Sequence, residues 1–446
     1  MSRKRRSRKL PEPQEVIIDA MSHEGRGIAH VKGKTVFVFG ALKGERVKIQ
    51  IQKTNRNFDQ AVALEIIEPS AKRIEPRCAA FKICGGCSFQ HLGNDDQVEF
   101  KQQVLLELMA HANIDVGEVM PPLRGDHWGY RKKARLGVRY VRKKARVLVG
   151  FRERNSSFLA DMQRCEVLIP RVGDRLEQIA RLIETLEARE QIPQIEVAAD
   201  ADNVVLVFRH LQDLCASDRD RLIEFGKAQD LWIQLQPGGP DTVTCLYPEE
   251  QSLYFEPLAQ GDIRIAFNAL DFVQVNSDIN QKMVAQALRY LDLKPQDRVL
   301  DLFCGLGNFT LPMARLCRQV VAVEADNAMV DRAARAAAAQ QIDNSSYQVA
   351  DLSSLDMQQS WLGQKFDKIL FDPPRSGAQE IAGIIKRFDA RTIVYVSCQP
   401  SSLVRDAAII CSQGYRMTHL GVMDMFPQTA HVESMAVFQQ SGQESK

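Results

Sequence analysis

The chain has no long apolar segment. Of its 446 residues, 45% are hydrophobic and 26% are charged, yet no run approaches the roughly 18 apolar residues that a membrane-spanning helix needs. The basic start leads directly into Leu10-Pro11-Glu12-Pro13, without the apolar core of a secretory signal peptide. These absences predict a cytoplasmic globular protein with no membrane partner, and the length predicts two to four domains.

Cysteine is also scarce. Ten cysteines in a chain of this length are too few for a disulfide scaffold, and in a reducing compartment they more often serve metal binding or catalysis. Cys78, Cys84 and Cys87 lie close together, with five and two intervening residues, and Cys165 is a plausible fourth ligand. Four thiolates can hold a 4Fe–4S cluster or a tetrahedral zinc ion, and the spacing by itself slightly favours zinc.

The net charge is only +2, but the positive residues are concentrated. Six of the first ten residues are basic, and residues 124–154 hold twelve Lys or Arg against two acidic residues. Local positive fields of this kind favour phosphate backbones. Because the second cluster adjoins Trp128, Tyr130 and Tyr140, which could stack on bases, we favour RNA binding over an ordinary solvated surface.

Three shifts in composition divide the chain. A basic tail, residues 1–12, precedes residues 13–70, where alternating apolar and polar residues and frequent glycines predict a small antiparallel β-barrel. Residues 71–268 mix helical and strand patterns and include the clustered cysteines. Residues 269–446 alternate strand-like and helix-like runs, which predicts a parallel sheet with helices on both faces. The fold class is therefore multidomain α/β, with an OB-like barrel first and a Rossmann-like domain last.

Successive strand ends in the last region carry groups suited to a nucleoside. Residues 301–309 follow a buried strand and open a helix, and their two glycines let the backbone pass close to a ligand. Glu324 ends the next strand, where a carboxylate can bind ribose hydroxyls, and Asp351 could accept from an adenine amino group. The longer Gly-x-Gly-x-x-Gly pattern is missing, which favours S-adenosylmethionine over a dinucleotide. A Rossmann-like sheet that binds no nucleoside is the alternative.

A fourth strand end carries Asp372-Pro373-Pro374-Arg375. The two prolines fix the backbone, so that Asp372 is expected to face the cofactor and the substrate. An aromatic residue after the prolines would suggest methylation of an adenine amino group, with the flipped base stacked on that ring. Arg375 occupies the place instead, and this directs attention to a ring carbon as the methyl acceptor.

Cys398 closes the β-branched run that begins at Thr392, and Pro400 stops the strand. Carbon 5 of uracil is too poor a nucleophile to attack a sulfonium methyl unaided, but a thiolate adding to carbon 6 creates an enolate that can. Cys398 suits that role, and Glu433 could then remove the proton at carbon 5, with His431 as a rival base. The alternatives are a buried core thiol and a solvated surface carboxylate.

Taken together, these motifs resemble the RNA uracil-C5 methyltransferase family. The third region carries Asp-Leu-Phe-Cys-Gly-Leu-Gly-Asn-Phe, Asp-Pro-Pro-Arg, Ser-Cys-Gln-Pro and His-Val-Glu in the family's order. The first region resembles a TRAM domain, a small RNA-binding barrel. The middle cysteines resemble the iron–sulfur site of the branch that methylates bacterial 23S ribosomal RNA, and the likeness spans nearly the whole chain.

The resemblance implies a role for each site residue. Cys398 would be the nucleophile and Glu433 the base that removes the proton. The cofactor, S-adenosylmethionine, would be contacted by Gln274, Phe303, Asn308, Glu324, Asp351 and Asp372. A structural 4Fe–4S cluster, with zinc as the lesser alternative, would be held by Cys78, Cys84, Cys87 and Cys165.

The implied substrate is a specific uridine of 23S ribosomal RNA. The family members that act on transfer RNA generally lack both the barrel and the cysteine cluster, and this chain has both. Two alternatives remain: a non-catalytic RNA-binding or assembly factor that retains the fold, and methylation of another 23S site or of transfer RNA. The sequence indicates no obligate protein partner, and we expect a monomer.

Overall fold

The computed structural model describes residues 11–442, so the predicted basic tail lies almost entirely outside the described part. The chain forms two compact units. Unit 1 contains residues 11–100 together with Arg152–Phe158 and Gln428–His431, and unit 2 contains the rest. The predicted division into a barrel, a central domain and a methyltransferase domain is a finer one, and it stays a prediction.

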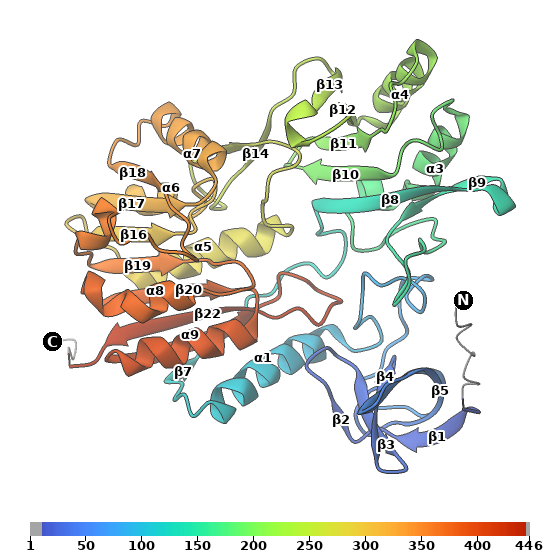
Figure 1. Ribbon diagram of the computed structural model, residues 1–446, viewed down its shortest axis with the longest axis horizontal. Helices are drawn as coiled ribbons and strands as arrows, with labels where there is room; N and C mark the ends of the chain where they lie inside the picture. The colour runs from blue at the N-terminus through green and yellow to red at the C-terminus, as the bar shows by residue number, and fades with distance from the viewer. Residues whose placement is uncertain (1–10, 443–446) are drawn as a thin grey trace, which may run out of the picture. The chain divides into compact units, whose positions relative to one another are not determined.

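Unit 1 is built on a curled sheet (Figure 1). Its strands are β1 (Gln14–Ile17), β2 (Ala20–Met21), β3 (Gly27–Val31), β4 (Lys34–Phe39), β5 (Arg46–Thr54) and β6 (Phe58–Glu68), in the order β1-β5-β6-β4-β3-β2. Apolar residues at alternate positions point to one face, and Val36, Val38, Val47, Ile49 and Ile51 therefore form the core.

The strand pairing departs from the antiparallel barrel predicted for this region in one place. β4 and β6 run parallel, with Thr35 opposite Phe58. The chain leaves β4, forms β5 without pairing it to β4, and reverses through the turn after Thr54, so that β6 returns in the direction of β4. The alternation of apolar residues identifies strands but not their partners, and the parallel pair was therefore missed.

The first sheet of unit 2 contains the basic strands. It consists of β8 (Lys133–Val141), β9 (Arg146–Gly150), β10 (Gln194–Ala199), β11 (Val204–Arg209), β12 (Trp232–Gln236) and β13 (Thr244–Tyr247), in the order β13-β12-β11-β10-β8-β9. The helices of this part are α2 (Pro170–Gly173), α3 (Leu176–Thr185), which packs on β9, and α4 (Ala216–Gln229), which packs on β12 and β13. The hairpin of β14 (Leu253–Phe255) and β15 (Ile265–Phe267) follows.

The second sheet of unit 2 confirms the predicted parallel architecture. Its parallel strands are β16 (Arg298–Leu302), β17 (Gln319–Glu324), β18 (Ser345–Val349), β19 (Lys368–Phe371) and β20 (Thr392–Ser397). β22 (Glu433–Gln440) and β21 (Tyr415–Met423) continue the sheet as antiparallel strands, and β7 (Glu118–Val119) lies at the edge. The strand order is β18-β17-β16-β19-β20-β22-β21-β7.

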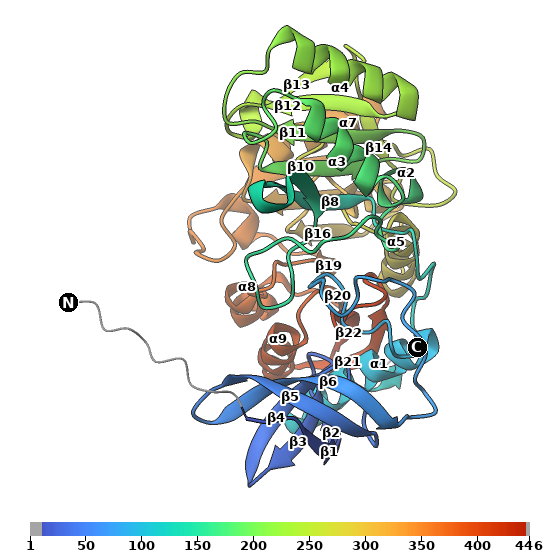
Figure 2. The ribbon, with the colours of Figure 1, turned by 90° about the vertical axis from the view of Figure 1, so that its right-hand side faces the viewer.

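Helices cover both faces of this second sheet, and α8 (Gln379–Ile384) and α9 (Pro400–Ser412) lie on the side opposite to α5 (Ser277–Leu291) (Figure 2). α6 (Thr310–Ala314) packs on β17, and α7 (Asn327–Ala339) packs on β17 and β18. Parallel strands present their carboxyl ends at one edge of a sheet, and ligands bind outside that edge. The strand ends that carry the predicted site residues therefore share this edge.

α1 (Asn94–His111) begins in unit 1 and continues into unit 2 from Lys101 onward. No helix in the described part of the chain combines the length and the apolar character that crossing a bilayer demands.

Candidate active site

The loop after β16 is shaped for close approach of a ligand. Phe303, Gly305 and Gly307 have φ angles of 62°, 54° and 93°, in the left-handed region that favours glycine and is strained for phenylalanine. A Cβ added at Gly305 would meet no atom within 4 Å, so this side of the loop is open. The amide of Cys304 donates to the carbonyl of Val323 at 3.1 Å, which ties the loop to β17.

Glu324 is fixed beside that loop by backbone hydrogen bonds. Its Oε2 accepts from the amide of Gly305 at 3.1 Å, and its Oε1 accepts from the amides of Ala325 at 2.7 Å and Asp326 at 3.2 Å. A carboxylate has about four acceptor sites, so it can still accept from a ligand hydroxyl. The structure thus places Glu324 beside the glycine loop, in a defined orientation.

Asp301, which is buried, and Asp372, which is half-buried, add carboxyl groups at the same edge. Asp301 is 1% exposed, and its Oδ2 accepts from the Thr310 hydroxyl at 2.5 Å while its Oδ1 is buried with no protein partner. Burial raises the pKa of Asp301 to about 7, and the negative charges of Asp372 and Glu324 act in the same direction. Burial also raises the pKa of Asp372 to about 7. Sequence reasoning did not single out Asp301, although it opens the glycine motif.

Asn308 and Gln274 lie near the start of α5. The amides of Asn308 and Asn280 form a reciprocal pair, with both hydrogen bonds at 2.9 Å. Gln274 and Asn280 line one cavity of about 110 Å³, and the loop that carries Gln274 is held by a 2.9 Å hydrogen bond from the amide of Lys132 to the carbonyl of Val275. Asn280 was not among the predicted site residues, because no local sequence pattern indicates that it pairs with Asn308, 28 positions away.

Asp351 lies two residues beyond β18 and is exposed. Its Oδ1 accepts from the amide of Ser353 at 2.9 Å and from the Ser353 hydroxyl at 2.6 Å, and these bonds lower its pKa. The neighbouring amide of Ala350 donates to the carbonyl of Glu324 at 2.9 Å. The backbone just before Asp351 is therefore hydrogen-bonded to Glu324. One oxygen of the Asp351 carboxylate already accepts two hydrogen bonds from Ser353 in a local turn.

Strand pairing brings Cys398 and Glu433 to the same end of β20 and β22. The two strands are antiparallel, with Ser397 facing Ser434 as the last pair of the ladder, and Cys398 and Glu433 are the residues directly after Ser397 and directly before Ser434. Cys398 is half-buried and Glu433 is 7% exposed. Residues directly across an antiparallel ladder have their Cβ atoms about 4.5–5.5 Å apart, so the last pair brings the neighbouring thiol and carboxyl group together at the carboxyl end of β20.

Burial and nearby charges perturb the acidity of both groups. Burial, followed by the negative charges of Glu433 and Asp372, raises the pKa of the Cys398 thiol to about 12, and Arg375 opposes this shift. Burial and then Asp372 raise the pKa of Glu433 well above its usual range, while Arg375 and Lys101 act to lower it. Strong shifts in several groups at one sheet edge are typical of active sites.

The loop that carries Arg375 is anchored to the helix after Cys398. The Ser402 hydroxyl donates to the carbonyl of Arg375 at 2.9 Å. Buried Asp406 accepts from the amide of Ala378 and from the hydroxyl of Tyr395, each at 2.7 Å. These contacts fix the Asp-Pro-Pro-Arg loop and the thiol-bearing strand end to α9.

His431, the rival base, belongs to unit 1, whereas Glu433 belongs to unit 2. The amide of His431 donates to the Thr429 hydroxyl at 3.3 Å within unit 1. Glu433, rather than His431, directly precedes the Ser434 that pairs with Ser397, the neighbour of Cys398.

Cys78, Cys84 and Cys87 all lie in unit 1, and Cys165 lies in unit 2. Arg154 donates to the carbonyls of Cys84 at 2.9 Å and of Cys87 at 2.5 Å, and the amide of Cys165 donates to the carbonyl of Gly173 at 2.9 Å. Within residues 11–442, no group of three or more Cys, His, Asp or Glu side chains is arranged to hold a metal ion. The cysteine-ligated cluster therefore remains a prediction.

The basic strands are partly neutralised. Arg135 and Arg139 are exposed on β8, while Leu136 and Val138 between them are buried. Arg135 pairs with Glu196. On the connection to β9, Arg142 pairs with Glu190 at 2.6 Å and Lys144 pairs with Asp161 at 2.8 Å. The exposed surface is thus less positive than the count of basic residues suggests.

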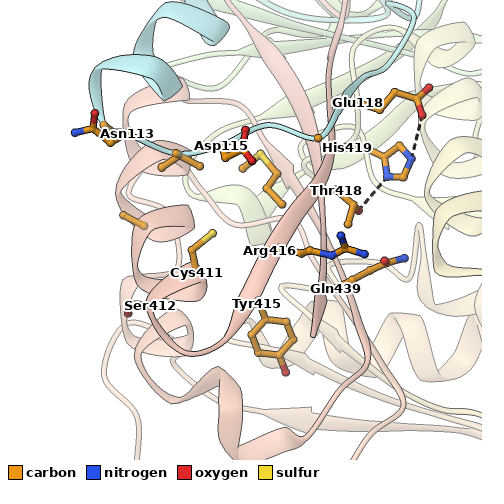
Figure 3. A pocket seen from close by; sticks show the side chains of 15 residues that line it. Asn113, Asp115, Glu118, Cys411, Ser412, Tyr415, Arg416, Thr418, His419 and Gln439 are labelled. Carbon is orange, nitrogen blue, oxygen red and sulfur yellow. Dashed lines mark hydrogen bonds and ion pairs between the residues drawn. The ribbon is translucent and has the colours of Figure 1, made fainter. Parts of the chain in front are cut away.

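A separate cavity of about 840 Å³ lies at the other end of β21 (Figure 3). Its lining includes Arg416 and Thr418, and His419 contacts Glu118 at 3.6 Å and Thr418 at 3.0 Å. Glu433 pairs with Met423 at the opposite end of the same strand. This cavity is therefore not part of the predicted site.

Comparisons with known proteins agree with the fold and with the family that the motifs resemble. The tRNA (uracil-5-)-methyltransferase family matches residues 93–441, and the TRAM domain matches residues 9–64. The chain belongs to the tRNA (uracil-5-)-methyltransferase family, as the motifs predicted.

Two relatives carry a more specific name. The 23S rRNA (uracil(1939)-C(5))-methyltransferase RlmD of Alkalilimnicola ehrlichii is 48% identical and covers 99% of this chain and 100% of the relative. The protein of the same name from Xanthomonas campestris pv. campestris is 47% identical and covers 96% and 97%. The Pyrococcus abyssi tRNA (uracil-54, C5)-methyltransferase, solved with S-adenosyl-L-homocysteine, shares the fold at a TM-score of 0.71, with 19% identity over 95% of this chain and 100% of that chain.

Proposed function

We infer that this chain is a 23S ribosomal RNA methyltransferase that methylates carbon 5 of uridine 1939 with S-adenosylmethionine. Relatives close to half identical over nearly the whole length carry this activity in their name. The observation that supports the chemistry is the pairing of β20 with β22, which brings the Cys398 thiol and the buried Glu433 carboxyl group to one end of the two strands, close enough for Glu433 to act on the thiol electrostatically.

Cys398 acts as the nucleophile. Its sulfur forms a bond to carbon 6 of the uracil, and the electrons of the C5–C6 double bond move into the ring as an enolate. Carbon 5 thereby becomes nucleophilic enough to take a methyl group. The thiol must first lose its proton, which burial disfavours and the positive charge of Arg375 favours.

Glu433 acts as the base that completes the reaction. After methylation, carbon 5 carries both the methyl group and its original hydrogen. The Glu433 carboxylate takes that proton, the C5–C6 double bond re-forms, and the bond from carbon 6 to the Cys398 sulfur breaks. The proton then passes to solvent, so that one proton is released for each methyl group transferred.

The carboxyl edge of the sheet suits a cationic nucleoside. S-adenosylmethionine supplies the methyl group when bound and carries positive charge on its sulfonium and ammonium groups. Asp301 and half-buried Asp372 offer carboxyl groups, and Asp301 Oδ1 is buried with no protein partner. Glu324 and Asp351 would bind the ribose and the adenine, and Phe303, Asn308 and Gln274 would complete the cofactor contacts.

RNA contacts come from two predicted surfaces. The TRAM barrel of unit 1 would bind single-stranded bases, and the exposed arginines of β8 would bind phosphates. The target uracil must leave its stack to reach Cys398, which costs a few kcal/mol and favours a loop or junction over a regular helix.

We also propose that Cys78, Cys84, Cys87 and Cys165 hold a 4Fe–4S cluster, with zinc as the alternative. The donor chemistry suits either metal, because four thiolates are the common ligand set of both. The cluster would have a structural role. Iron and acid-labile sulfide in equal amounts, about four of each per chain, would support the cluster, and one zinc ion per chain would support the alternative.

The substrate assignment is tested by methylating 23S and transfer RNA transcripts side by side and mapping the modified base by mass spectrometry. We expect 5-methyluridine at position 1939 of the 23S transcript, and no product with Cys398→Ala. Methylation of transfer RNA with none of 23S RNA would overturn the assignment.

A further inference from the structure

Unit 2 contains a lysine that is almost completely buried. Lys101 is 1% exposed, and its Nζ lies 2.6 Å from Asp424 Oδ1 and 3.0 Å from the carbonyl oxygen of Phe426. Asp424 is also 1% exposed. Lysine is seldom buried to this degree, because removing two charges from water costs several kcal/mol per ion and their attraction offsets this only in part. A buried ion pair therefore calls for an explanation beyond stability.

The ion pair lies next to the proposed base. Asp424 directly follows Met423, and Met423 is the register partner of Glu433 in the β21–β22 pair. The amide of Asp424 donates to the carbonyl of Leu123 at 2.9 Å, which fixes the backbone at this point. Lys101 and Glu433 are close enough to act on each other electrostatically. The Lys101 ammonium group is thus held by a short contact to Asp424, one residue along the chain from the β21 partner of Glu433.

The charges around Glu433 show why a buried cation nearby matters for the ionisation of this carboxyl group. Asp372 and Cys398 face it from the ends of β19 and β20, and a negative charge on either disfavours the ionised base. Arg375 and Lys101 are the cations that favour it. Arg375 is exposed, so water screens its charge, whereas the charge of buried Lys101 acts through the protein interior, where it is screened less.

We propose that Lys101, locked in place by Asp424, is a positioning residue that keeps Glu433 ionised so that it can remove the carbon 5 proton. The proposal rests on the assignment of Glu433 as the base. A purely structural ion pair would instead only join α1 to the segment after β21, and it would leave the protonation of Glu433 unchanged.

The two roles are separated by measuring two steps of the reaction in single turnovers. RNA carrying tritium at carbon 5 of the target uridine releases it only when the proton is removed, while radioactive methyl groups in the covalent protein–RNA complex report methyl transfer. The variants are Lys101→Met, which removes the charge, and Lys101→Met/Asp424→Leu, which also avoids leaving an unpaired buried carboxylate. Lys368→Met is the control, because Lys368 is half-buried and bonds to Thr392 at the other end of β20.

In both Lys101 variants we expect tritium release at pH 7 to fall at least about tenfold, the effect of one pH unit in the ionisation of a base. Methyl transfer should be little changed, so methylated adduct accumulates. The acid limb of the tritium-release profile should move to higher pH by about one unit or more. Lys368→Met should show neither change.

A folded double variant with the wild-type acid limb, or with both steps slowed equally, would overturn the proposal. Glu433→Gln separates this failure from a failure of the proposed function. If Glu433→Gln releases tritium at the wild-type rate, Glu433 is not the base, and the proposed role of Lys101 is then also wrong. If Glu433→Gln stops at the methylated adduct while the double variant behaves as wild type, only the role of Lys101 is wrong.

Discussion

Asp301→Asn should make unit 2 more stable at neutral pH. The folded protein raises the pKa of Asp301 from 3.8 to about 7, so it keeps a proton that the unfolded chain releases. Stability therefore falls as the pH rises from about 4 to about 7, by at most about 1.4 kcal/mol per pH unit and at most about 4 kcal/mol in total. Asparagine has no such proton to lose, and it can still accept the hydrogen bond from Thr310.

At pH 8, the increase in the free energy of unfolding from Asp301→Asn should be smaller than the maximum of about 4 kcal/mol. The amide nitrogen of the variant takes the place of the unpartnered Oδ1, and an unsatisfied buried donor costs about 1–3 kcal/mol. We therefore expect a net stabilisation of about 1–3 kcal/mol at pH 8 and a destabilisation at pH 4, where the aspartate is protonated in the folded state and its proton loss from the unfolded chain has only begun. The distinctive result is that the curves of unfolding free energy against pH for the wild type and for Asp301→Asn cross between pH 4 and pH 8.

Urea unfolding followed by tryptophan fluorescence measures this directly. The sequence holds three tryptophans, and Trp128, Trp232 and Trp361 all lie in unit 2, so the signal reports the unit that contains Asp301. The same variant should bind S-adenosylmethionine more weakly, because a negative group facing a cation is lost. A stability difference that does not change between pH 4 and pH 8 would refute the reasoning that burial raises the pKa of Asp301.

Three further results follow from the site. Glu433→Gln should form the methylated Cys398 adduct but release product at least about 100-fold more slowly, as gel analysis of the covalent complex would show; normal turnover would exclude Glu433 as the base. Asp406→Ala should destabilise unit 2 by about 2–4 kcal/mol in urea unfolding, because the buried Tyr395 hydroxyl and the Ala378 amide lose their acceptor; an unchanged midpoint would contradict this. Cys84→Ser should lower bound iron by elemental analysis, whereas Cys245→Ser, an exposed cysteine outside the predicted ligands, should not; equal metal content in both would contradict the ligand assignment.

Much of the site was predictable because parallel strands place their carboxyl ends together. The motifs at Asp301–Phe309, Glu324 and Asp372 each follow an apolar run, and their shared edge follows from the alternation of strands and helices. The left-handed residue Phe303 lies in the loop whose two glycines predicted close approach of the backbone to a ligand.

The rest depended on pairings that no local pattern encodes. Lys101 and Asp424 are 323 residues apart in the sequence, and Asn280 meets Asn308 across a helix and a loop. The parallel pairing of β4 with β6 has the same cause, because apolar alternation specifies a strand but not its neighbour. Cys398 and Glu433 were predicted from chemistry and family resemblance, whereas the strand pairing that brings them to the same end of β20 and β22 came only from the structure.

The central claim is that Cys398 attacks the target uracil. The most direct test incubates the protein and S-adenosylmethionine with 23S RNA fragments that contain 5-fluorouridine, followed by denaturing electrophoresis and peptide mapping. Fluorine cannot be removed as a proton, so the methylated adduct should stay trapped, with the RNA attached at Cys398 and no adduct in Cys398→Ala. An adduct on another cysteine, or no adduct with a 23S fragment that the protein demonstrably binds, would contradict the account.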